Sequence, residues 1–295
     1  MGSDVERWDL SAPASQVLLT GASTPPAWAV KLAFKELVLR RSLRLGNERR
    51  RRLLVLHRET DVLSVERWPA QGTERPLVGV MEAFPKAAVF RTDSGAVSID
   101  VAAKEVRRWY RAGGGYVQAE VLPHLQFRGF YRVTETQRGK EWELTEAGRQ
   151  KLAELRALLN AGQMDLPGWL RNDPARAAAY LTGAGATLLL LGNPVTWMWE
   201  LMAEVLAGGT VAADGIPSGA GSPFVLVPEP LRPERDSEQE QRPSWSEESM
   251  VFEWESGHAS EDAPVGGGGG FESPGQAIDA GFADADGDGD GGDGE

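Results

Sequence analysis

The spacing of apolar residues changes period between Gln126 and Leu159, and this change predicts a hairpin followed by a helix. Apolar residues occupy every second position of two short segments, Phe130–Thr136 and Glu141–Leu144, with polar residues between them. This is the period of a half-buried strand. The connecting residues, Gln137–Lys140, are polar and include a glycine, as a short hairpin loop requires.

The segments on either side of this hairpin are predicted to be helical. Leu152 and two further leucines recur at spacings of three and four, so a helix is expected to begin at about Thr145, which is a suitable N-cap. Before the hairpin, Tyr116–Arg128 has a helical pattern but contains Pro123, which removes a backbone donor. Either a helix begins at this proline or two short helices meet there.

A helix followed by a hairpin is also predicted near the N-terminus. Ser11–Leu19 and Ala27–Ser42 have the apolar pattern of helices. Leu43–Leu45 and Arg51–His57 then form a candidate hairpin around a turn at residues 46–47, which are glycine and asparagine. Because helix followed by hairpin occurs twice, the sequence predicts two winged helices in tandem.

The fold class expected is therefore α+β and mainly helical, with four parts. Residues 1–95 and 96–160 are expected to form two winged-helix-like domains. Residues 161–210 are expected to be a packed helical extension, because the uncharged run Ala177–Gly192 is shorter than the ~20 residues of a membrane span. From residue 211 the apolar surface is too small to offset the entropy of ordering, which predicts that 211–295 is a disordered acidic Gly/Pro-rich tail.

Charge separates the two halves of the chain. Residues 1–160 hold 26 Lys+Arg and 19 Asp+Glu, a net charge of plus 7, whereas 161–295 hold 5 and 24, a net charge of minus 19; the whole chain is therefore at −12. A basic folded part with an acidic appendage is typical of proteins whose tail competes with, or mimics, a polyanionic partner.

The densest positive cluster is a set of six arginines in or next to the first hairpin. These candidate anion- and phosphate-binding residues are Arg44, Arg49, Arg50, Arg51, Arg52 and Arg58. Guanidinium groups on a wing commonly bind phosphates, either of nucleic acid or of anionic membrane lipids. The structural alternative is a solvated edge strand whose charges prevent sheet-to-sheet aggregation.

The helix before the second hairpin is a poor candidate for reading nucleic-acid bases. Its candidate recognition helix, Tyr116–Arg128, carries His124 and a single arginine together with Glu120 and an internal proline. Sequence-specific readout usually requires several base-reaching side chains on a positive face. DNA binding is therefore possible but not favoured.

The tail contains an aromatic motif and an acidic repeat. The candidate interaction motif comprises Trp245, Met250, Phe252 and Trp254 among acidic residues. Such a segment either folds on a protein partner or packs back on the chain's own domains.

The acidic repeat at the end of the sequence matches the spacing of a calcium-binding loop. The candidate ligands are Asp284, Asp286, Asp288, Asp290 and Glu295. Position 8 is a glycine, where such loops place an apolar residue, so a chance match of an Asp/Gly tract is the alternative. Weak, nonspecific binding of divalent cations fits the composition better than a preformed metal site.

Neither an enzyme nor a cofactor site is expected. The histidines His57, His124 and His258 are far apart in sequence, and none has a neighbouring nucleophile. Cysteine is absent, which excludes disulfides and thiolate metal sites and fits a reducing compartment. The first ten residues lack an apolar signal-peptide core, so we expect a cytoplasmic protein, with association with a membrane as the alternative.

Apolar residues, glycines and a few other residues carry a resemblance to a known family; they are Pro13, Leu18, Gly21, Leu37, Leu43, Leu45, Leu144, Thr145, Gly148, Tyr180 and Gly192. At these positions the sequence resembles the cytosolic C-terminal region of a family of bacterial predicted membrane proteins of unknown function, which have Gly-rich tails. The resemblance implies a tandem winged-helix interaction module, although the transmembrane helices of that family are missing. Residues 27–57 are also similar to the Golgi-phosphoprotein-like family, which binds phosphoinositide head groups.

These observations predict a non-enzymatic protein-interaction or scaffold protein, whose acidic tail is an interaction or autoinhibitory arm. The sequence leaves the protein partner unidentified. Two other functions stay open: a DNA-associated transcriptional regulator and a peripheral binder of anionic membrane lipids.

Overall fold

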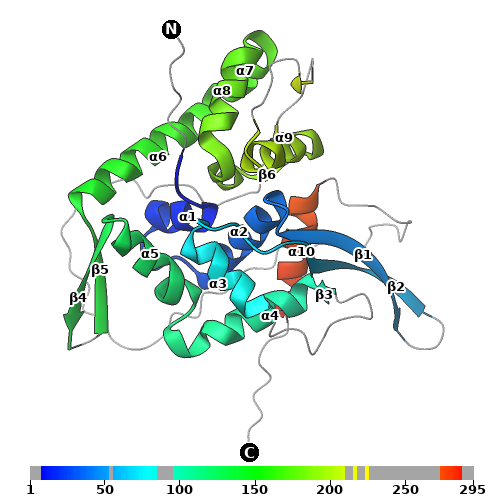
Figure 1. Ribbon diagram of the computed structural model, residues 1–295, viewed down its shortest axis with the longest axis horizontal. Helices are drawn as coiled ribbons and strands as arrows, with labels where there is room; N and C mark the ends of the chain where they lie inside the picture. The colour runs from blue at the N-terminus through cyan, green and yellow to red at the C-terminus, as the bar shows by residue number, and fades with distance from the viewer. Residues whose placement is uncertain are drawn as a thin grey trace, which may run out of the picture. The chain divides into compact units, whose positions relative to one another are not determined.

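The computed structural model describes residues 8–52, 56–84, 96–137, 139–209, 215–217, 223–225 and 273–287, and only the backbone at 49–52, 56–59, 225 and 284–287. These residues form a mainly helical α+β fold with three small antiparallel sheets, as the sequence predicts (Figure 1). All of them belong to one compact unit.

The N-terminal part consists of two helices and a long hairpin. Helices α1 (Ala12–Thr20) and α2 (Pro26–Leu39) confirm the two predicted helices. Strands β1 (Leu43–Arg52) and β2 (Leu56–Val65) then pair over ten residues, and β3 (Val97–Ser98) joins the outer side of β2. In Figure 1 the hairpin extends away from the helices.

The prediction of a turn at residues 46–47 is wrong. Gly46 pairs with Val62, so it lies within β1, and the two strands end at residues 52 and 56. A turn at 46–47 would pair Leu45 with a glutamate, whereas the observed register pairs Leu45 with the buried Leu63. Apolar pairing with a distant strand therefore overrides the local turn preference.

The middle of the chain is a series of short helices. Helix α3 (Arg75–Ala83) precedes α4 (Ile99–Tyr110), which is followed by the short 3-10 helix η2 (Arg111–Gly113). A π-helical turn, η3 (Val117–Val121), then leads into α5 (Leu122–Phe127). Of the two alternatives for Pro123, the second is correct: two helical pieces meet there, and the wider π turn accommodates a residue without a backbone donor.

The hairpin and helix predicted between residues 126 and 159 are confirmed. Strand β4 (Tyr131–Thr136) pairs with β5 (Gly139–Leu144), and the apolar residues that alternate in the sequence face each other across the pair. Thr136 pairs with Gly139, so the connection is two residues shorter than predicted. The Thr145 hydroxyl oxygen accepts the Gly148 N–H at 3.0 Å and caps α6 (Glu146–Met164).

Three further α-helices and a 3-10 helix follow in the described part of the chain. They are α7 (Leu166–Asn172), α8 (Pro174–Ala184), the 3-10 helix η4 (Gly185–Leu190) and α9 (Thr196–Leu206). Strand β6 (Asn193–Pro194), between η4 and α9, pairs with β7 (Phe224–Val225). Every residue of η4 is buried, which confirms that the uncharged run packs in the core.

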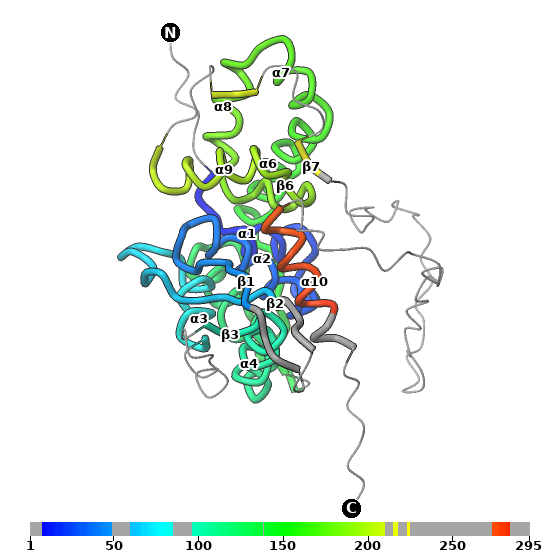
Figure 2. The backbone as a smooth tube through the Cα atoms, turned by 90° about the vertical axis from the view of Figure 1, so that its right-hand side faces the viewer, coloured from blue at the N-terminus to red at the C-terminus, as the bar shows by residue number. Residues whose placement is uncertain are grey.

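The prediction that the tail is disordered is wrong for residues 273–287. They form Ser273 and helix α10 (Pro274–Gly287), whose Ile278 and Phe282 are 0% and 1% exposed. Figures 1 and 2 both place α10 beside α2. Two large apolar residues one turn apart bury enough surface against an existing core to order a segment that is mainly small and acidic.

One continuous core crosses the predicted domain boundaries. Buried apolar residues of α1, α2, α4, α6, α8, α9 and α10 belong to the same cluster. The boundaries at 95, 160 and 210 stay predictions; residues 85–95 lie outside the described part.

Candidate functional site

The hairpin places Arg49–Arg52 and Arg58 at its far end and leaves Arg44 apart from them, near its base. Arg44 is exposed near the base of β1, and Arg49–Arg52 form the last four residues of that strand. Arg58 lies in β2 and is the register partner of Arg50. Arg51 is the register partner of His57.

The corrected register changes the surroundings of these arginines. Residues 53–55, which the sequence gives as Leu-Leu-Val, lie between the paired ends of the two strands. The arginines therefore flank a short apolar connection on both sides, whereas a turn at 46–47 would have placed them after the turn on a single strand.

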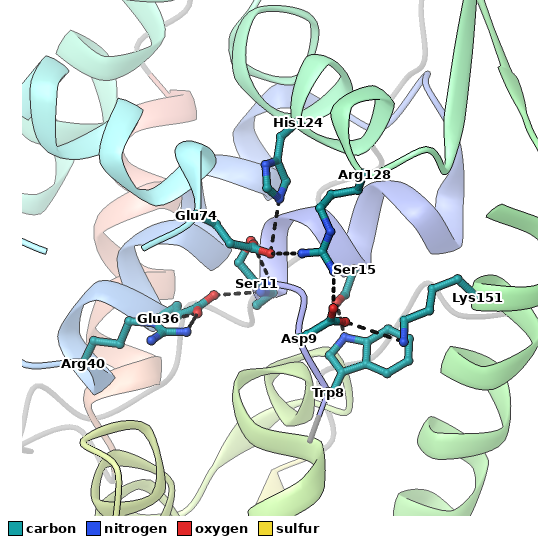
Figure 3. A network of polar contacts seen from close by, with 11 residues as sticks. Trp8, Asp9, Ser11, Ser15, Glu36, Arg40, Glu74, His124, Arg128 and Lys151 are labelled. Carbon is teal, nitrogen blue, oxygen red and sulfur yellow. Dashed lines mark hydrogen bonds and ion pairs between the residues drawn. The ribbon is translucent and has the colours of Figure 1, made fainter. Parts of the chain in front are cut away.

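The polar residues of the candidate recognition helix are held by contacts within the protein. Figure 3 shows His124 of α5 and Arg128, which directly follows α5, pointing at Glu74, which precedes α3. Arg128 also binds Asp9, and Lys151 of α6 lies 3.6 Å from the same carboxylate and 4.2 Å from the Trp8 ring. These ion pairs join α5, α6 and the N-terminal segment.

His124 lies against the carboxylate of Glu74. Its Nε2 lies 3.2 Å from Glu74 Oε1, but the two atoms are not aligned for a hydrogen bond. The nearby Ser11 is 1% exposed, so its hydroxyl is closed to a substrate. Ser11, Glu74 and His124 therefore lie close together, with the serine hydroxyl shielded from solvent.

Two carboxylates from distant segments complete the N-terminus of α1. Glu74 Oε2 accepts the Ser11 N–H at 2.7 Å, and Glu36 Oε2 accepts the Ala12 N–H at 2.7 Å. The Ser11 side chain itself makes no capping bond. Because the first N–H groups of a helix lack partners within the helix and carry partial positive charge, both carboxylates stabilise α1.

Glu36 is the most buried member of this network. Its side chain is 0% exposed, and it forms an ion pair of 2.7 Å with Arg40. Burial raises the pKa of Glu36; Arg40 and the Ala12 N–H partly oppose the shift, while the neighbouring Glu74 adds to it.

A shallow groove lies between α5 and the segment before α3. Its volume is about 640 Å³, and its lining includes Glu74, Arg75, Glu120, His124 and Phe127. Arg75 Nε binds Glu120 at 2.7 Å, and Tyr110 donates its hydroxyl to the same carboxylate at 3.1 Å. Burial and Glu120 raise the pKa of Tyr110. The charges of the groove are thus engaged with one another, and the 87% exposed Phe127 is an apolar side chain at its edge.

A second buried polar cluster fixes α10. Lys35 Nζ of α2 lies 2.8 Å from Asp279 Oδ1, and Asn193 of β6 binds both residues at 2.6 Å. Burial lowers the pKa of Lys35, and the Asp279 carboxylate opposes this shift. The cluster joins an early helix, a short strand and the last helix.

The remaining predicted residues are only partly described. Asp284 and Asp286 lie in the last part of α10, whereas Asp288, Asp290 and Glu295 are outside the described residues, as are Trp245, Met250, Phe252 and Trp254. Within the described ranges, acidic and histidine side chains do not gather into a group that could hold a metal ion. In the same ranges, each helix is too short or too polar to cross a bilayer.

The sequence reasoning missed Lys35, Glu36, Glu74 and Asp279. A signal for α10 was present in Ser273-Pro-Gly-Gln276, which has the form of a capping box, and the Gln276 side chain does accept the Ser273 N–H at 3.1 Å. The partners of Glu36 and Glu74 have no sequence signal, because they are backbone N–H groups of a distant helix.

Comparison with family models, with curated proteins and with solved structures gives no match for this chain. Its function is therefore inferred from the hairpin and the polar clusters themselves.

Proposed function

We propose that this protein is a non-enzymatic interaction module that binds an anionic lipid surface through the β1–β2 hairpin. The observation that carries the proposal is the register of the hairpin, which pairs Arg50 with Arg58 and leaves an apolar tripeptide between the strand ends. Arginine binds lipid phosphates through its guanidinium fork, while short apolar segments enter the interface between head groups and acyl chains.

In this proposal, the second helix–hairpin unit has a structural role and does not bind the ligand. We interpret α4, η3–α5 and the β4–β5 hairpin as winged-helix-like, and α1, α2 and β1–β2 as a divergent first copy. In η3, α5 and the residue after α5, Glu120, His124 and Arg128 are engaged by Arg75, Glu74 and Asp9, so few side chains remain for reading bases. This favours lipid or protein surfaces over sequence-specific DNA.

The proposal is tested by flotation of the full-length protein with vesicles. Vesicles of phosphatidylcholine are compared with vesicles that also contain about 30% phosphatidylserine, at low and at physiological salt. The test variant replaces Arg49–Arg52 by glutamate. A control variant carries the same change of charge at four exposed arginines of other elements, Arg108, Arg111, Arg156 and Arg171.

We expect the wild type and the control variant to float with the anionic vesicles only, and the hairpin variant to stay in the soluble fraction. Equal flotation of wild type and hairpin variant, or no flotation of the wild type, would overturn the proposal. A labelled DNA duplex is measured in parallel. If DNA binds with a steep salt dependence that the hairpin variant loses, and the vesicles do not bind, the protein is a DNA-associated regulator instead.

A further inference from the structure

We propose that the surface covered by α10 is a binding site for an acidic amphipathic helix of a partner protein, and that α10 is its tethered competitor. This surface, the α10 groove, is formed by α2, the start of α4, Asn193 of β6 and Trp199 of α9. The site does not use the arginines of the hairpin and is independent of the function proposed above. The partner helix carries the pattern of α10: a large apolar residue, a carboxylate directly after it and an aromatic residue one turn further on.

Helix α10 packs on the fold as a separate piece. It is the last element that the structure describes, and residues 226–272, a stretch of 47, separate it from β7 in the sequence. Its packing partners α2 and α4 lie within the first 110 residues, and Figures 1 and 2 show it alongside α2. Gln276, Ala280 and Ala283 are partly or fully exposed, so one side of the helix faces solvent. A helix that lies in a groove in this way can be replaced by another helix of the same pattern.

The apolar part of the groove fits a helix with large and small residues in fixed places. Ile278 and Phe282 are buried, and the Phe282 ring meets Phe34 of α2 edge-on, with 5.7 Å between the ring centroids. A Cβ atom at Gly281 would lie 2.6 Å from the Ile99 side chain, so the helix backbone approaches the start of α4 closely. A partner helix therefore needs a small residue directly before its aromatic residue, which makes the groove selective by shape.

The polar part of the groove receives one carboxylate. Lys35 Nζ lies 2.8 Å from Asp279 Oδ1, and Lys31 Nζ lies 3.5 Å from the same oxygen. Asn193 donates its side-chain N–H to Asp279 Oδ2 at 2.6 Å and accepts a hydrogen bond from Lys35 at 2.6 Å. Two cations and an amide thus surround a single carboxylate. An apolar helix in this groove would leave Lys35 buried without a charged partner, so the groove selects a helix with a carboxylate at this position.

Helix α10 is itself a weak occupant of the groove. Three of its last four residues are Asp284, Asp286 and Gly287, and its last turn contains no basic residue. Acidic residues near a helix C-terminus oppose the macrodipole, and glycine lowers helix propensity. The tether compensates for this weakness, because it keeps α10 at an effective concentration on the order of 0.1 to 1 mM. A partner helix with better helix-forming residues beyond the contact pattern therefore replaces α10, and the tether sets the affinity that the partner needs.

A labelled peptide of residues 273–287 serves as the probe, and its binding to the full-length protein is measured by fluorescence anisotropy. Two variants loosen the protein's own α10 and leave the groove residues unchanged: Phe282→Ala, and Gly281→Val, whose side chain would overlap Ile99. The matched control is Phe127→Ala, which removes the 87% exposed phenylalanine of α5 and leaves α10 in place. Far-UV circular dichroism establishes which variants keep their helices.

We expect both α10 variants to bind the peptide at least about tenfold more tightly than the wild type and Phe127→Ala, because the tethered helix no longer occupies the groove. Equal binding by all four proteins would overturn the inference, as would no binding by an α10 variant that keeps its helices. If the wild type is a dimer in sedimentation and binds the peptide only as it dissociates, the occupant is the α10 of a second copy, and the partner helix is wrong.

Altered peptides test the requirement for a carboxylate. Asp279→Asn in the peptide should weaken binding to the α10 variants at least about thirtyfold, because Lys35 stays buried without its partner. Asp284→Asn removes the same charge outside the contact pattern and should bind like the unaltered peptide. Equal effects of the two changes would show a general charge attraction and overturn the inference.

The wild-type protein provides a test that requires no substitution in the protein. A peptide with Asp284→Lys and Asp286→Lys places positive charge at the helix C-terminus and should bind the wild type about three- to tenfold more tightly than the unaltered peptide. The same lysine peptide with Asp279→Asn is the control for nonspecific attraction and should bind more weakly; equal binding of these two lysine peptides would contradict the proposed site. Because none of these substitutions touches the hairpin, vesicle binding succeeds or fails independently of these results.

Discussion

Lys35 of α2 and Asp279 of α10 form an ion pair of 2.8 Å, although they come from opposite ends of the sequence. The Lys35 side chain is 6% exposed and that of Asp279 25%. A buried cation that loses its partner keeps its desolvation cost without the compensating attraction. The pair therefore contributes to holding α10 against α2.

Asp279→Asn is expected to lower the free energy of unfolding by about 3 kcal/mol, because Lys35 stays buried without a charged partner. The double variant Lys35→Met with Asp279→Asn should recover most of this loss, since no uncompensated charge remains. Urea unfolding of both single variants and the double variant gives the coupling energy. Additive losses in the double variant would show that the two residues act independently.

Gly148→Ala is expected to destabilise the protein by about 3 kcal/mol, because a methyl group there would overlap the carbonyl oxygen of Phe130. Gly168→Ala is the matched control, since its helical position has open space around it. There the loss of glycine's extra entropy should stabilise the fold by about 0.5 to 1 kcal/mol. Thermal unfolding compares the two, and changes of equal sign would contradict the close approach at Gly148.

Thr145→Ala is expected to cost about 1 kcal/mol of unfolding free energy, because the Gly148 N–H loses its acceptor at the start of α6. Thr145→Ser keeps the hydroxyl and serves as the control. It should retain most of the stability, including the hydrogen bond that Thr145 donates to the Gly129 carbonyl oxygen at 2.7 Å. If serine costs as much as alanine, the methyl group of threonine matters more than the cap.

Titration of Glu36 is expected to lower the free energy of unfolding as the pH rises above 4.5, the ordinary pKa of a glutamate side chain. Burial raises the pKa of Glu36 in the folded protein, so within this window the folded state binds more protons than the unfolded state. The contribution is fully favourable below 4.5 and is lost as the pH passes through the raised folded pKa. Glu36→Gln keeps an oxygen acceptor for the Ala12 N–H and removes the titration.

The measurement is the difference in unfolding free energy between wild type and Glu36→Gln from pH 4 to about pH 8. We expect this difference to move against the wild type as the pH rises. Parallel curves for the two proteins would contradict the raised pKa of Glu36.

Local sequence patterns were enough to predict the β4–β5 hairpin and the helix that follows it. The alternation from Tyr131 to Leu144 specifies which residues face each other, and Thr145 specifies where α6 begins. The same reasoning failed at residues 46–47, where a turn pair with the right composition lies inside a strand. A turn preference is a short-range term, and the pairing of Leu45 with Leu63 outweighs it.

The sequence alone determined the mainly helical class, the capped helix α6 and the concentration of arginines near the first hairpin, because each follows from neighbours in the chain. Only the tertiary structure decided that α10 is ordered, that Glu36 and Glu74 cap α1, and that Lys35 has a partner at Asp279. These contacts join residues far apart in the sequence, and the burial that gives them their strength exists only once the whole core has formed.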